Sequence, residues 1–108
     1  AAKARVRAVE YEKAATRREL VVALTDAYQV LVAAHAEAQS VERDLLPAAE
    51  QTLDETEEGY ERGQFTLLSV LESRNTLFDI RETYLDALSR YASAQAQIEA
   101  LTRPSTIN

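Results

Sequence analysis

The stretch from Tyr60 to Leu77 reads YERGQFTLLSVLESRNTL, and it contains the point where the chain is predicted to turn back on itself. Gly63 suits the left-handed backbone conformation that often ends a helix. Thr66 can cap a following helix by accepting a hydrogen bond from a free backbone N–H. We therefore expect a short tip turn at 63–65. A turn of this length makes the two helices that it joins antiparallel neighbours.

Glycine and proline are almost absent from the rest of the chain. Glycine occurs only at positions 59 and 63, and proline only at 47 and 104, so long helices are expected on both sides of the turn. The first helix is predicted over about residues 3–62. Its apolar and small residues recur at alternating steps of four and three, the heptad spacing of a coiled coil. These residues are Leu20, Leu24, Ala27, Leu31, Ala34, Ala38, Val41, Leu45, Ala48 and Thr52.

The second helix is predicted over about residues 66–102, because Pro104 disfavours helix at the residue before it. Residues 104–108 are expected to form an irregular tail. The second helix has a heptad seam of its own. Its members are Val70, Ser73, Leu77, Ile80, Tyr84, Ala87, Tyr91, Ala94, Ile98 and Leu101.

The two seams can be compared by folding the chain at residues 64–65. The fold brings seam residues opposite one another: Leu31 with Ile98, Ala38 with Tyr91, Leu45 with Tyr84, and Thr52 with Leu77. Two patterns that were read separately thus agree on one reversal point. The expected fold class is all-α, a long antiparallel two-helix coiled-coil hairpin.

Pro47 lies inside the predicted first helix. Proline removes one backbone hydrogen bond and bends a helix or breaks it. The heptad pattern on both sides favours a bend, and a true break remains the alternative.

A single hairpin cannot bury all the apolar residues. The first helix is longer than the second, so about 25 residues at its start should overhang without a partner. Each helix also has a second apolar set, which predicts a further neighbour on each side. These sets are Leu46, Ala49, Leu53, Thr56 and Tyr60 in the first helix, and Leu67, Leu71, Phe78, Leu85, Leu88 and Ala92 in the second.

Composition argues against several functional classes. The formal net charge of −6 is unfavourable for binding nucleic acid. No apolar run reaches the roughly 20 residues of a membrane-spanning helix. With one histidine, His35, and no cysteine, the chain has no metal-binding cluster or catalytic triad. We expect no enzyme activity, no catalytic residue, no metal site and no cofactor. The acidic run at 54–61 is interpreted as a solvated face.

The segment from Tyr60 to Leu77 resembles the hairpin tip of the TolC family of outer-membrane efflux channels. That pattern has an aromatic residue, a basic residue, Gly, two variable residues, Ser or Thr, and two aliphatic residues, followed by Asp-Val-Leu. Flanking segments at 45–50, 84–88 and 99–102 resemble the heavy-metal cation efflux branch of the family. This sequence has Ser69 where the family usually has Asp.

The resemblance implies a fold and a set of partners. Three protomers of such a channel form an α-helical tunnel in the periplasm of a Gram-negative bacterium, and each protomer contributes two hairpins. Residues 1–108 would be one hairpin of the larger protein, from its second repeat. The hairpin itself would not be embedded in the membrane. Its tip would bind a periplasmic adaptor (membrane fusion) protein, which links the channel to an inner-membrane pump. Exported substrate, with metal cations as a candidate, would pass without chemistry.

The same resemblance implies roles for individual residues. Arg62, Gly63, Gln64, Phe65, Thr66, Leu67 and Leu68 would contact the adaptor. Glu72 would be the acidic residue near the tunnel entrance. Two alternatives stay open at this point: the coiled-coil hairpin of an adaptor protein, and an unrelated structural coiled coil.

Overall fold

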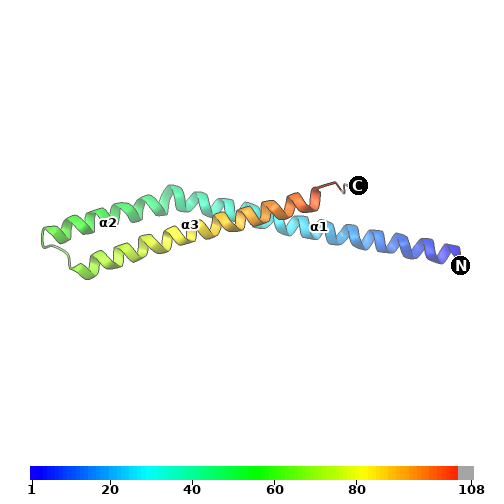
Figure 1. Cartoon of the computed structure of the whole chain (residues 1–108), viewed down its shortest axis with the longest axis horizontal. Coiled ribbons are helices and arrows are strands. Elements are labelled where there is room, and N and C mark those ends of the chain that lie inside the picture. The colour runs from blue at the N-terminus through cyan, green and yellow to red at the C-terminus, as the bar shows by residue number, and fades with distance from the viewer. Residues whose placement is uncertain (105–108) are drawn as a thin grey trace.

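The computed structural model describes residues 1–104 and consists of two long helical arms joined by a tight turn. The first arm comprises α1 (Ala2–Ser40), the π-helical turn η1 (Val41–Leu45) and α2 (Leu46–Glu61). The second arm is α3 (Leu67–Thr102). The molecule is 88 Å long, and α3 runs back along the first arm as an antiparallel neighbour (Figure 1). The predicted all-α hairpin is confirmed.

The arms are unequal in length, as expected. The N-terminal part of α1 extends past the end of α3 (Figure 1), and its side chains are almost all exposed as far as residue 22. The first buried residue of this arm is Ala27. Pro104 follows the end of α3 outside any helix, and the rest of the predicted tail lies outside the described residues.

Small side chains fill the contact between the arms. The buried residues are Ala27, Ala34, Ala38, Val41 and Ala49 on the first arm, and Val70, Leu77, Ala87 and Ala94 on α3. Val41 is the largest of those that are almost fully buried. Small residues let two helix axes approach to about 8 Å, the lower end of the usual range. The contact therefore depends on close approach of the backbones and buries few large side chains.

The first arm stays helical through Pro47. The N–H of Leu46 donates to the carbonyl of Val41, five residues earlier, which is the hydrogen bond of a π-helix. This wider turn comes just before Pro47, which lies in the first turn of α2, where its missing N–H costs least. The arm changes direction at this point (Figure 1). The predicted bend is thus present, and the chain does not break into two separate helices.

The π-helical turn also moves the seam. In a regular heptad, Leu45 would follow Val41 as the next residue that faces α3. The π-helical turn adds one residue, so Leu46 takes this position instead. The seam of α2 then continues through Ala49, Leu53 and Thr56, all buried or half-buried. The residues predicted for this part of the seam are exposed: Leu45 (49%), Ala48 and Thr52. Four of the five residues assigned from the sequence to a second face of this helix, Leu46, Ala49, Leu53 and Thr56, are thus buried or half-buried, whereas the fifth, Tyr60, is exposed.

Adjacent alanines test this shift. Ala49→Asp should lower the free energy of unfolding by about 3 kcal/mol, because it places a charge in the contact between the arms. Ala48→Asp should change it by less than about 0.5 kcal/mol, because position 48 is exposed. Urea unfolding of the chain, followed by circular dichroism, measures both. The reverse order would mean that the heptad continues through residue 45 without a shift.

Candidate functional site

Two backbone hydrogen bonds close the C-terminal end of α2 at the turn between the arms. The N–H of Gln64 donates to the carbonyl of Gly59 at 2.7 Å, and the N–H of Gly63 donates to the carbonyl of Tyr60 at 3.0 Å. This pair of bonds defines the Schellman motif that closes many helices. Gly63 has φ = 78°, the left-handed region in which glycine avoids the steric cost of a Cβ. Gly63 therefore has the role predicted for it.

The start of α3 is capped as the sequence predicts. The side-chain oxygen of Thr66 accepts a hydrogen bond from the N–H of Ser69 at 3.2 Å. The two hydroxyls lie 3.2 Å apart, so Ser69 also contacts the capping side chain. Both ends of the turn are consequently fixed by local hydrogen bonds, which give the tip a defined shape.

We call Arg62 to Leu68 the tip. All seven of its residues are exposed. Three are large and apolar, with exposed fractions of 49% for Phe65, 53% for Leu67 and 63% for Leu68. A cluster of large apolar residues at the end of a rod marks a surface that suits contact with another protein.

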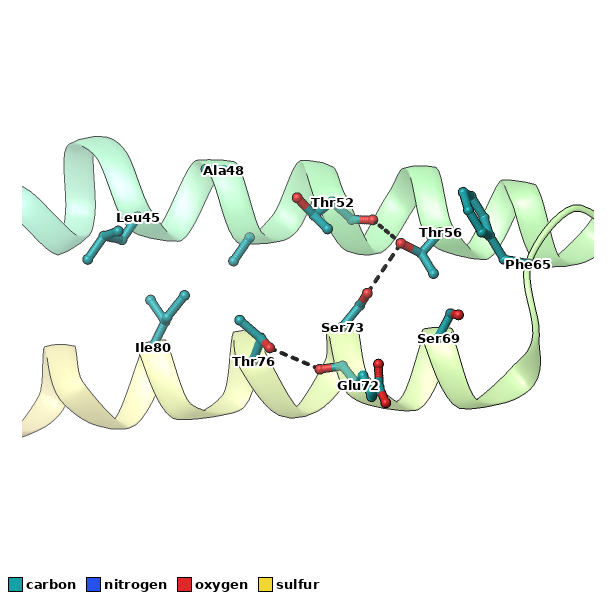
Figure 2. Close-up of a pocket in the computed structure, with 11 residues that line it drawn as sticks. Leu45, Ala48, Thr52, Thr56, Phe65, Ser69, Glu72, Ser73, Thr76 and Ile80 are labelled. Carbon is teal, nitrogen blue, oxygen red and sulfur yellow. Dashed lines mark hydrogen bonds between the residues drawn. The ribbon is translucent and has the colours of Figure 1, made fainter.

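A groove with a volume of about 510 Å³ runs between the arms beside the tip. Its lining is mostly small or hydroxyl-bearing: Leu45, Ala48, Ala49, Thr52, Thr56, Phe65, Ser69, Glu72, Ser73, Thr76 and Ile80. Figure 2 shows Phe65 at the tip end of the groove and Glu72 on its α3 wall. The hydroxyl of Ser73 donates to that of Thr56 at 3.2 Å and ties the two walls together (Figure 2). The structure therefore places Glu72, predicted at a tunnel entrance, in the wall of a groove that faces solvent.

The residues predicted to form the seam lie at different depths. Ala38 and Leu77 are buried, whereas Leu31, Tyr84, Tyr91 and Ile98 are half-buried. Leu45 differs from the prediction, because the π-helical turn moves it from the seam to the groove. His35 lies on the surface, and its ring packs against that of Tyr91 with a centroid distance of 5.8 Å.

Ion pairs cross between the arms on the outer surface. Arg90 of α3 binds Glu37 of α1, and it also binds Asp86 of its own helix at 3.1 Å. The hydrogen bonds that Arg90 donates to these carboxylates, first to Glu37 and then to Asp86, raise the pKa of its guanidinium above its usual value. Arg74 binds Glu57 of α2 at 3.2 Å. These pairs are exposed and contribute little to stability, but they agree with the antiparallel register.

The structure shows no chemistry-bearing cluster among residues 1–104. No three His, Cys, Asp or Glu side chains in this range gather closely enough to hold a metal ion. None of the helices in this part of the chain combines the length and hydropathy needed to cross a lipid bilayer. What the described residues offer is a surface, formed by the tip and the adjoining groove.

Two features of this surface were missed by reasoning from the sequence. The groove arises from the phase shift at η1, which sequence spacing does not reveal unless Pro47 is taken as a sign of it. Sequence reasoning identifies Gly59 only as one of two glycines, yet the ring of Phe65 lies where its Cβ would be. A glycine inside a heptad helix, six residues before an aromatic residue in a tight turn, was the available signal.

Comparison with known proteins places this hairpin in a family. Residues 1–102 match the family described as outer membrane efflux protein. The chain belongs to the outer membrane efflux protein family. It is 34% identical over 90 residues to the cobalt-zinc-cadmium resistance protein CzcC of Cupriavidus metallidurans, a match that covers 83% of the chain. The aligned region spans 22% of the length of that relative. No solved structure matches the chain.

Membership in this family supports the resemblance to TolC-type channels of the heavy-metal branch. It favours a role in an outer-membrane efflux channel over the adaptor hairpin and the unrelated coiled coil. The description of the family names efflux, and the absence of enzyme activity in this chain stays a prediction.

Proposed function

We propose that this chain is one hairpin in the wall of the periplasmic tunnel of a homotrimeric outer-membrane efflux channel. The channel conducts exported substrate, and the tip of the hairpin binds a periplasmic adaptor coupled to an inner-membrane pump. Energy comes from the pump, and the hairpin performs no chemical step. The observation that carries the proposal is the exposed apolar tip on a hairpin of a chain that belongs to an efflux family.

The balance of buried and exposed residues supports an assembled wall. Among residues 1–104, nine apolar side chains are buried between the arms, whereas eighteen large apolar side chains are exposed. Beyond the tip residues Leu67 and Leu68, the exposed large apolar residues of α3 form one stripe: Leu71, Phe78, Leu85 and Leu88. Such a stripe matches a helix that has a second neighbour. In the proposed tunnel, helices of adjoining hairpins cover it.

The tip and the groove are the proposed adaptor-binding surface. Arg62 to Leu68 supply the contacts, and Gly63 and Thr66 act by holding the turn. Glu72 is assigned to the tunnel entrance, where its carboxylate faces the solvent next to the groove. Residues 41–62 carry eight carboxylates against Arg43 and Arg62, so the end of the hairpin nearest the tip is acidic.

Cysteine cross-linking tests the contact with the adaptor. The chain contains no cysteine, so a single introduced cysteine in it is unique. In cells that express the parent channel, Phe65→Cys or Leu67→Cys should form a disulfide with a cysteine on the adaptor, because both positions lie on the exposed tip. Thr25→Cys, exposed but far from the tip, is the control and should form none. Failure of every tip position, or equal yield at position 25, would contradict docking at the tip.

Divalent metal cations are the proposed cargo. The proposal rests on the named relative, a cobalt-zinc-cadmium resistance protein, and on the acidic end of the hairpin. Deleting the gene of the parent channel should make cells more sensitive to cobalt, zinc and cadmium salts, measured as the lowest concentration that stops growth. Restoring the gene should restore resistance. Unchanged sensitivity to all three metals would contradict metal cations as the cargo. It would not bear on the contact between the channel and the adaptor, which the cross-linking experiment tests separately.

A further inference from the structure

Gly59 occupies a position where glycine is unfavourable for the helix. It lies in the last turns of α2 and is buried. Gly63 is the one glycine with positive φ, so Gly59 does not use the conformational freedom that glycine provides. A glycine inside a helix is less stable than alanine by roughly 0.5–1 kcal/mol. The absence of a Cβ at this position therefore needs another explanation.

The ring of Phe65 supplies that explanation. A Cβ added to Gly59 would lie 2.5 Å from Cε2 and 3.2 Å from Cγ of Phe65, and closer still to Cδ2. Real Cβ atoms essentially never come within 3.0 Å of another heavy atom, so the approaches to Cε2 and Cδ2 are steric clashes. The Cδ2–Cε2 side of the aromatic ring occupies the space that a side chain would fill at position 59.

The backbone holds Phe65 against the same residue. The carbonyl of Gly59 accepts hydrogen bonds from Gln64 at 2.7 Å and from Phe65 itself at 3.2 Å. Because the main chain of Phe65 is tied to Gly59 by this hydrogen bond, a backbone shift that made room for a Cβ would strain or break it. The ring would have to rotate to another side-chain conformation.

We propose that Gly59 is a positioning residue for the tip: its bare Cα seats the ring of Phe65, and the seated ring forms the end wall of the groove. Phe65 lines the groove together with Thr56, Ser69 and Glu72, and Figure 2 shows its ring beside α2. Rotation of the ring away from Gly59 opens this end of the groove and moves an apolar contact of the tip into solvent. The ring position can be tested on its own, whereas its effect on docking rests on the proposed function.

Fluorine NMR tests the position of the ring. The chain contains two phenylalanines, so a chain labelled with fluorophenylalanine gives two resonances. Phe78 is exposed on α3 and serves as an internal reference. Gly59→Ala should move the Phe65 resonance toward that of a solvent-exposed ring and leave that of Phe78 unchanged. Glu58→Ala, an exposed neighbour in the same turn, should move neither. An unchanged Phe65 resonance in Gly59→Ala would overturn the proposal.

A test of folding separates positioning from general damage. Gly59→Ala should keep the helical circular dichroism of the natural chain, because alanine favours helix and the ring is free to turn outward. In Gly59→Ala/Phe65→Ala there is no ring for the new Cβ to meet, so the double variant should be at least as stable as Phe65→Ala alone. A double variant less stable than Phe65→Ala would show that Gly59 serves the fold through other contacts, which contradicts the assignment.

The cross-link at position 67 tests the consequence for docking. In a parent channel carrying Leu67→Cys, adding Gly59→Ala should reduce the yield of disulfide-linked channel and adaptor by roughly fivefold or more. A loss of this size is expected when one anchoring side chain of an interface is displaced. Adding Glu58→Ala should leave the yield unchanged. A displaced ring with an unchanged yield would refute the role in docking. If the Leu67→Cys channel itself gave no cross-linked product with the adaptor, that result would refute the proposed function. The positioning role of Gly59 would then be decided by the fluorine NMR measurement.

Discussion

The reversal of the chain at Gly63 is the constraint on which the rest of the structure depends. Only a left-handed residue at this point lets α2 end in a Schellman motif and α3 begin after five intervening residues under the cap of Thr66. Because the turn is short and closed by hydrogen bonds, it determines which residues of the two arms lie opposite each other. The hydrogen bond between Thr56 and Ser73 and the ion pair between Glu37 and Arg90 are consequences of that register.

The contact between the arms buries mostly small side chains, and this property links the fold to the proposed function. Alanines at the centre of the contact bring the helices close, but they remove little apolar surface from water. Large apolar residues remain on the outside of α3 and at the tip, where the hairpin alone cannot cover them. A rod of this kind is well suited to side-by-side assembly, which agrees with membership in an efflux channel family.

Periodicity in the sequence was sufficient to predict two helices, their ends and their register. Gly63 and Thr66 were enough to place the turn, because each has a specific backbone role. Periodicity failed after Val41, where a π-helical turn before Pro47 adds one residue and replaces Leu45 by Leu46 in the seam. A heptad count assumes a uniform helix, so it cannot detect such a turn. The seat of Phe65 on Gly59 was equally out of reach, because it depends on a side-chain conformation set by the folded turn.

The antiparallel register is most directly tested by a distance between spin labels at Gln29 of α1 and Gln97 of α3, beside a surface hollow that Tyr28, Gln29 and Ile98 line together. Double electron–electron resonance on a doubly labelled chain, diluted with unlabelled chain to suppress contacts between molecules, should give a distance on the order of 20 Å, as for neighbouring helices with labels on their outer faces. A chain that continued as one straight helix through Gly63 would separate the labels by about 100 Å, beyond the range of the method. Loss of the short distance on dilution would mean that the arms pair between molecules, and it would contradict the hairpin.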